Sequence, residues 1–355
     1  MRIAQIAPLA ESVPPKLYDG TERVVSWLTE ELVALGHDVT LFASGDSETT
    51  AKLVPVISRA IRLARPKPET LAAYAAQLDA VAQAAHSFDV LHFHTDWIHL
   101  PLISRLGVPH LTTFHNRLDT PDLPRVAARF PRSPAVSISD HHRTPLAAAK
   151  WLGTVYHGMP AGALEPSFEK GRYLVFLGRL AKEKGPETAI RWARAVGMPL
   201  RMAAKIPRAE TRYYRDHLRP LIDGELIGLV GEVDDRAKRD LLSGAAALLF
   251  PIDWPEPFGL VMIEAMACGT PVVALRRGSV PEIVDEGVTG FIVSDDEEAI
   301  AALGRIGELD RRRVRATFER RFLSRRMAQD YLGHYAALAR SESRTSSPLG
   351  MLDGP

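Results

Sequence analysis

Two glutamates, Glu256 and Glu264, stand eight positions apart in a stretch that reads DWPEPFGLVMIEAMACGTPVV. A helix is expected to begin near Gly259, which places Glu256 in the preceding loop and Glu264 in the first turns. The first amides of such a helix favour an anion, because they have no acceptors within the helix. A carboxylate beside a phosphate is repulsive, so we expect the glutamates to accept hydrogen bonds from hydroxyls. A phosphate flanked by hydroxyl-rich groups describes a nucleotide sugar. The alternative is a capping glutamate followed by a solvent-facing one.

Two cations stand five positions apart in the segment GRLAKEKG, residues 178–185, which directly follows a predicted strand. Arg179 offers a planar fork to phosphate oxygens, and Lys184 offers a point charge. Together with a helix N-terminus they are able to neutralise a diphosphate, also as it leaves with growing negative charge. A solvated basic loop is the alternative interpretation of the pair.

Histidines are concentrated in the first part of the chain, where ten of the 12 lie before residue 160. His92 and His94 alternate at the end of a predicted strand and therefore share one face. His115 follows another predicted strand, at the end where ligands bind in open α/β sheets. A metal-dependent hydrolase site built from these three residues with Asp96 and His99 is one hypothesis. Hydrogen-bonded structural histidines are the other.

Three further features are weaker signals. Gly20, between the first strand and first helix, permits close approach of the backbone to a ligand. Eight arginines lie between Arg311 and Arg326, and their helical face would contact an anionic membrane or simply face solvent. Cys268 lies in an apolar helix and is expected to be a small buried residue rather than a nucleophile.

The elements that position these residues alternate between strand and helix. Apolar residues at Val24, Leu28, Leu32 and Leu35 predict a helix over 21–35, closed by Gly36. The predicted strands are 2–7, 38–43, 89–93, 110–114 and 134–138 in a first series, and 173–177, 200–203, 226–229, 247–251, 271–274 and 290–293 in a second. Short strand–helix–strand connections are typical of parallel α/β sheets. A Gly- and Pro-containing linker is expected over 158–171.

The expected organisation is therefore two α/β domains with a cleft between them. Residues 1–160 form the N-terminal, acceptor-side domain, and 161–330 form the C-terminal, donor-side domain. Residues 331–340 end a helix that is expected to cross back to the first domain, and 341–355 are expected to be disordered.

Composition excludes several classes of protein. The chain has 355 residues with 44 Lys+Arg against 43 Asp+Glu, so no basic excess points to nucleic acid. The single cysteine favours a reducing, cytoplasmic compartment. No apolar run is long enough for a membrane helix, and the first residues are expected to form a strand rather than a signal peptide.

The run PEPFGLVMIEAMACGTPVVA, residues 255–274, resembles the signature of retaining glycosyltransferases of family 4. GRLAKEKG is similar to that family's diphosphate-binding segment, and GEVDD at 231–235 to the stretch that borders the base. TFHN at 113–116 resembles the segment with an active-site histidine, and SISD at 137–140 also fits. The resemblance covers nearly the whole chain and implies the GT-B fold of two facing Rossmann-like domains.

The resemblance also implies roles for individual residues. Arg179 and Lys184 would bind the donor diphosphate, Glu264 the ribose, and Glu256 the hydroxyls of the transferred sugar. His115 would contact the sugar at the reaction centre, and Val233 would border the base. The remaining implied donor contacts come from the backbone of Phe258, Gly259, Leu260 and Gly20. The family loop usually reads Gly-Gly, whereas Asp19 precedes Gly20 here.

The function expected from the resemblance is retaining transfer of a sugar from a nucleotide diphosphate sugar, foremost a UDP-sugar, to an unknown hydroxyl acceptor. Such a hexosyltransferase needs neither metal nor other cofactor, since the cation pair takes the place of the metal's charge. The acceptor is a glycan, a lipid-linked molecule or a small molecule, and peripheral membrane contact would run through residues 311–326. The alternatives are a metal-dependent hydrolase, a non-catalytic nucleotide-sugar binder, and an epimerase or phosphorylase of the same fold.

Overall fold

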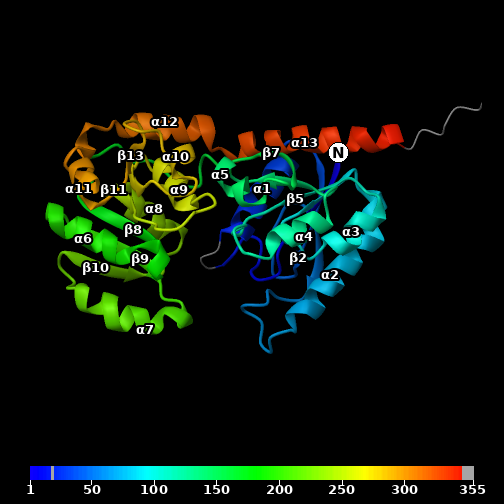
Figure 1. The fold of residues 1–355 in the computed structure, drawn as a ribbon, viewed down its shortest axis with the longest axis horizontal. Coiled ribbons are helices and arrows are strands. Elements are labelled where there is room, and N and C mark those ends of the chain that lie inside the picture. Colours follow the sequence, from blue (N-terminus) through cyan, green and yellow to red (C-terminus); the bar gives the residue numbers. More distant parts are fainter. Residues whose placement is uncertain (17–19, 346–355) are drawn as a thin grey trace, which may run out of the picture. The chain divides into compact units, whose positions relative to one another are not determined.

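The computed structural model describes residues 1–16 and 20–345, with side chains described to residue 340 (Figure 1). Asp19 lies outside the described residues. So do residues 346–355 of the predicted disordered tail, whereas residues 341–345 continue the last helix and correct the expectation there. The chain divides into two compact units. Unit 1 comprises residues 1–138, 145–155 and 325–355, and unit 2 comprises residues 139–144 and 156–324.

Unit 1 contains one parallel sheet of seven strands in the order β3-β2-β1-β4-β5-β6-β7. Its strands are β1 (Arg2–Ile6), β2 (Asp38–Ser44), β3 (Lys52–Ile57), β4 (Val90–Phe93), β5 (His110–Thr113), β6 (Pro134–Ser137) and β7 (Lys150–Thr154). Its helices are α1 (Thr21–Ala34), α2 (Thr70–Ala84), α3 (Leu100–Leu106), α4 (Leu123–Arg129) and α13 (Ser324–Thr345) from Arg325 onward.

Alternate residues of β1 and β4 in unit 1 face different helices. Ala4, Ile6, Leu91 and Phe93 pack with α2 and α3 in a common apolar core. The intervening residues, such as Gln5 and His92, face the opposite side of the sheet, where the tyrosines of α13 contact them. The predicted end of the first helix is confirmed, since Gly36 follows it with φ 85°. This left-handed backbone conformation favours glycine.

Unit 2 contains a second parallel sheet, with strand order β10-β9-β8-β11-β12-β13. Its strands are β8 (Tyr173–Arg179), β9 (Leu200–Lys205), β10 (Ile227–Gly231), β11 (Ala245–Phe250), β12 (Val272–Leu275) and β13 (Gly290–Val293). Its helices are α5 (Asp140–Arg143), α6 (Pro186–Val196), α7 (Thr211–Tyr213), α8 (Asp235–Ser243), α9 (Leu260–Ala267), α10 (Val280–Ile283), α11 (Asp296–Gly304) and α12 (Arg311–Arg321).

The strand order of unit 2 reverses between β8 and β11. The chain leaves β8 in one direction through α6, and leaves β11 in the other through α9. Right-handed crossovers in opposite directions place their helices on opposite faces of a sheet. Accordingly α6 packs against α11, while α9 packs against α8 and α12 (Figure 1). The predicted two-domain α/β fold class is confirmed.

Candidate functional site

The loops that follow β8 and β11 lie side by side at the carboxyl edge of the sheet of unit 2. This is the point where the strand order reverses, and open α/β sheets bind ligands at such points. The N–H of Asp253 donates to the carbonyl of Glu183 across the two loops at 3.1 Å. Gly185 has φ 70°, and a Cβ there would lie 2.1 Å from the carbonyl oxygen of Pro251. Only glycine therefore lets the two loops approach this closely.

The structure pairs the two predicted phosphate-binding cations with carboxylates. Lys184 Nζ lies 2.6 Å from Glu256 Oε2, with side chains 15% and 14% exposed. The same ammonium stands 4.6 Å from the centroid of the Trp254 ring. Arg179 lies at the end of β8, and its Nη2 is 3.3 Å from Glu183 Oε1. The Arg179 side chain is more exposed than that of Lys184. Glu256, which is expected to accept hydrogen bonds from sugar hydroxyls, balances the charge of Lys184 in this structure.

Helix α9 begins one residue after Gly259, as the sequence predicted. Gly259 is the N-cap with φ 80°, and the buried Phe258 precedes it. Leu260 is the first helical residue. The opening amides of α9 have no acceptors within the helix, so this end carries a partial positive charge beside the Lys184–Glu256 pair.

Glu264 is the fifth residue of α9 and is buried, with 5% of its surface exposed. Lys238 Nζ contacts its Oε1 at 2.6 Å and also reaches Asp235 at 3.1 Å. Lys238 comes from α8, which follows the loop that holds the half-buried Val233. Lys238 is not among the site residues predicted from the sequence. The signal that could have indicated Lys238 is its position in the helix that follows the GEVDD segment.

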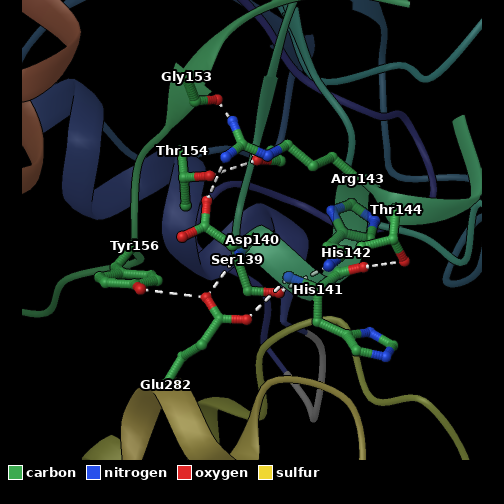
Figure 2. A network of polar contacts seen from close by, with 11 residues as sticks. Ser139, Asp140, His141, His142, Arg143, Thr144, Gly153, Thr154, Tyr156 and Glu282 are labelled. Atoms are coloured by element: carbon green, nitrogen blue, oxygen red, sulfur yellow. Dashed lines mark hydrogen bonds and ion pairs between the residues drawn. The ribbon is translucent and has the colours of Figure 1, made fainter. Parts of the chain in front are cut away.

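Glu282 fastens residues 139–144 within unit 2 (Figure 2). Its carboxylate accepts the N–H groups of Asp140 at 2.6 Å and His141 at 2.8 Å, and the Tyr156 hydroxyl at 3.1 Å. Burial, followed by the Glu282 charge, raises the pKa of Tyr156 to about 12. Ser139 Oγ donates to the carbonyl of Pro257 at 2.7 Å. Ser139 of the SISD segment thus supports the loop that leads into α9, and Glu282 holds the residues that follow Ser139. Glu282 is not among the site residues predicted from the sequence.

In unit 1, His115 lies beyond β5, next to the strand end that carries His94. His94 Nδ1 and His115 Nε2 are 2.9 Å apart. Asp96 has φ 49° and accepts from Asn116 Nδ2 at 2.7 Å. Such a positive φ is uncommon for a residue other than glycine. Burial raises the pKa of the Asp96 carboxyl, although hydrogen bonds from Asn116 and the His115 backbone oppose this.

Gly20 is the N-cap of α1 with φ −96°, so its backbone conformation does not require glycine.

The histidines of the alternative hydrolase hypothesis form hydrogen bonds within unit 1. His92 bonds Tyr335 at 2.7 Å and Thr113 at 2.8 Å through its two ring nitrogens. His99 likewise bonds Thr112 at 2.7 Å. Nowhere in residues 1–16 and 20–340 do three His, Cys, Asp or Glu side chains gather as a metal site would require.

The interpretation of residues 311–326 as one basic face is wrong for three of the arginines. Arg311 donates to the carbonyls of Ser167, Ser243 and Ala245 at 2.6–2.9 Å. Arg315 is buried and donates to the carbonyls of Ala161, Leu164 and Ala267, and Arg321 bonds Asp285. These side chains bind the linker and helix ends of unit 2.

The predicted burial of Cys268 is confirmed, and this burial raises the pKa of the thiol to about 11.

Comparisons with known proteins agree with this architecture. Residues 164–317 match the family "Glycosyl transferases group 1", and residues 18–153 match "Glycosyltransferase Family 4". A phosphatidyl-myo-inositol mannosyltransferase of Mycolicibacterium smegmatis is 27% identical over 354 residues, covering 90% of this chain and 87% of its own length. The chain is therefore an enzyme, a glycosyltransferase of the family 4 type.

Solved structures share the fold. AviGT4, a glycosyltransferase involved in avilamycin A biosynthesis, has a TM-score of 0.71 at 24% identity, covering 96% of this chain and 98% of its own. HepE of Anabaena in complex with UDP and glucose has a TM-score of 0.72 at 18% identity, covering 95% of this chain and 100% of its own. The fold is thus the two-domain GT-B fold. Every helix in the described part of the chain is too short or too polar to cross a membrane.

Proposed function

We propose that this glycosyltransferase moves a sugar from a nucleotide diphosphate sugar to a hydroxyl acceptor and retains the anomeric configuration. The observation that carries the proposal is the grouping of Lys184, Glu256 and the open N-terminus of α9 at one sheet edge. A cation and helix amides suit a diphosphate, and carboxylates suit sugar hydroxyls.

Each donor-binding residue has a distinct role in this proposal. Arg179, Lys184 and the amides of residues 258–260 hold the diphosphate, with Gly20 approaching it from its own loop. Glu264 accepts from the ribose hydroxyls and Val233 borders the base. Glu256 and His115 contact the transferred sugar. Binding of the diphosphate draws Lys184 from Glu256 toward the phosphates, which makes the carboxylate available to sugar hydroxyls.

The reaction proceeds as a substitution on one face of the sugar. The bond between the anomeric carbon and the diphosphate oxygen breaks, and the acceptor oxygen bonds to that carbon on the same side. The acceptor proton passes to the departing phosphate oxygen, so no protein nucleophile is required. The protein supplies positioning and stabilises the developing negative charge. Side-chain cations and helix amides provide this stabilisation without a metal.

A UDP-sugar is the first candidate donor. A mannosyl donor with an inositol-containing acceptor is the second, and it is supported by the name of the M. smegmatis relative, which aligns with 90% of this chain. A thermal-shift screen with UDP, GDP, ADP and their sugars identifies the nucleotide. A ligand at about 100 times its Kd stabilises the protein by about 2.7 kcal/mol, which such a screen detects.

Transfer assays with the bound donor then separate the related functions. Release of the nucleoside diphosphate together with an α-glycoside from an α-configured donor supports retaining transfer. Binding without turnover in the presence of glycan, phosphatidylinositol and small-molecule acceptors would instead indicate a nucleotide-sugar binding protein. Conversion of the donor to another sugar nucleotide would indicate an epimerase, and cleavage by inorganic phosphate would indicate a phosphorylase.

A further inference from the structure

A continuous chain of polar side chains runs through the interior of unit 1 and ends at His115. Apart from His115, each member has 2% or less of its surface exposed. Its members, in order from His115, are His115, His94, Gln5, Tyr335, His92, Thr113 and Tyr331. The distances between the polar atoms of successive members are 2.9, 2.8, 3.1, 2.7, 2.8 and 2.9 Å.

The strands and the last helix of the unit contribute to this chain because of their side-chain periodicity. Gln5 of β1, His92 of β4 and Thr113 of β5 point to the same face of the sheet, opposite the apolar core with α2 and α3. Tyr331 and Tyr335 are one helical turn apart on α13, so both hydroxyls reach that face. The last helix thereby completes a polar network under the loop that carries His115.

Gln5 gives the chain a direction, because its amide donates through nitrogen and accepts through oxygen. Its Nε2 donates to the Tyr335 hydroxyl, so its Oε1 accepts from His94 Nε2. A neutral His94 protonated at Nε2 has its acceptor at Nδ1. The neighbouring Nε2 of His115 is then the donor at 2.9 Å.

The other arm follows the same order. Tyr335 accepts from Gln5 and donates to His92 Nδ1, so His92 Nε2 donates to Thr113. Thr113 Oγ1, which accepts from His92, then has its own proton available for the Tyr331 hydroxyl at 2.9 Å. Burial lowers the pKa of His92 well below its ordinary value, so this ring is neutral and carries one proton, as the order requires.

We propose that His94, Gln5 and Tyr335 are positioning residues that hold His115 as a neutral ring protonated at Nε2. The inference deepens the proposed function, on which the catalytic importance of His115 rests. In a neutral histidine, the hydrogen-bond partner of one ring nitrogen decides which of the two nitrogens carries the proton. A ring protonated at Nε2 keeps its lone pair on Nδ1. His115 therefore accepts a hydrogen bond from a sugar hydroxyl, and the neutral ring adds no positive charge to the reaction centre.

The proton position is measured directly by ¹⁵N NMR of the full chain labelled at histidine, at pH 7.5 and without ligand. Signals that disappear in His115→Asn identify the ring of His115. The expected pattern is that of a neutral ring with its proton on Nε2. A ring protonated at Nδ1, a doubly protonated ring, or an equal mixture of the two neutral forms would overturn the proposal, whatever the enzyme's activity.

Two matched variants test whether the proton position depends on the chain. Tyr335→Phe and Tyr331→Phe each remove one buried hydroxyl from α13, but only Tyr335 stands between Gln5 and His92. We expect Tyr335→Phe to give a mixture of His115 forms, and Tyr331→Phe to leave the wild-type pattern. An unchanged His115 pattern in a folded Tyr335→Phe would contradict the proposal.

The kinetic consequence is measured with the nucleotide sugar that the wild type turns over fastest among the UDP-, GDP- and ADP-sugars. Tyr335→Phe should lower kcat about five- to tenfold, the effect of one lost hydrogen bond, with less than a twofold change in the KM of the donor. Tyr331→Phe should stay within twofold of wild type. Equal loss in both variants would indicate a merely structural role. If the wild type transfers no sugar, the proposed function fails while the NMR test still decides the proton position.

Discussion

Lys184→Met removes a single charge from the candidate diphosphate site and keeps the length of the side chain. If Lys184 stabilises the departing diphosphate, its loss removes one charge-stabilising group, which costs about 3–4 kcal/mol in comparable sites. Since a factor of ten in rate corresponds to about 1.36 kcal/mol, kcat should fall several-hundred-fold. Initial rates at saturating donor measure this fall, because saturation separates turnover from donor affinity.

The same substitution leaves the Glu256 carboxylate without its partner, so stability must be measured alongside the rates. The side chains of the pair are 15% and 14% exposed. Its loss should therefore cost about 2 kcal/mol, between the values for exposed and buried pairs. This corresponds to a fall in Tm of about 4–8 °C for a unit of this size. The double variant Lys184→Met/Glu256→Gln should recover part of that stability but none of the activity.

Lys182→Met is the matched control, since Lys182 lies in the same short turn and is exposed. It should stay within about twofold of the wild-type kcat, because a solvated lysine outside the site contributes little. The assignment of Lys184 is refuted if Lys184→Met remains within threefold of wild type. It is also refuted if Lys182→Met loses as much activity, because the effect would then follow the overall charge of the loop.

The remaining predictions concern the glutamates, metals and the arginines of α12. Glu264→Gln should weaken binding of the free nucleoside diphosphate in calorimetry, whereas Glu256→Gln should leave it nearly unchanged and lower turnover; equal losses would mean that one glutamate is misassigned. Transfer should continue in excess EDTA, since side-chain cations and helix amides balance the diphosphate; complete loss that one divalent ion restores would contradict this. Arg315→Met should destabilise the protein to urea by about 3 kcal/mol because it leaves three carbonyls unpaired, whereas the exposed Arg313→Met should change stability by less than about 0.5 kcal/mol. Equal midpoints for these two variants would show that the Arg315 contacts do not stabilise the fold.

The sequence was sufficient to predict the alternating strands and helices, because buried parallel strands appear as short apolar runs with glycine at the helix ends. Two strands at the edges of the unit 1 sheet escaped prediction. β3 contains Pro55 and β7 contains Gly153, and both residue types are unfavourable within a strand. Edge strands tolerate them because one side makes no ladder hydrogen bonds.

The candidate site was predictable where a motif fixes the backbone and unpredictable where partners come from distant segments. The start of α9 after Gly259 follows from local sequence. The pairing of Glu264 with Lys238 depends on α8 and α9 packing together, and that of Glu256 with Lys184 on two adjacent loops. Arg315 looks like a surface residue in the sequence because its carbonyl acceptors belong to the backbone of distant residues, which carries no sequence signal.

The central claim is retaining transfer from a nucleotide diphosphate sugar without a metal. Proton NMR of the reaction in EDTA tests it most directly, with an α-configured donor from the thermal-shift screen and glycan, phosphatidylinositol and small-molecule acceptors. We predict that nucleoside diphosphate and an α-linked product appear together, at equal rates. A β-linked product would contradict retention, and an intact donor in EDTA that is consumed only after a divalent ion is added would contradict the metal-free mechanism.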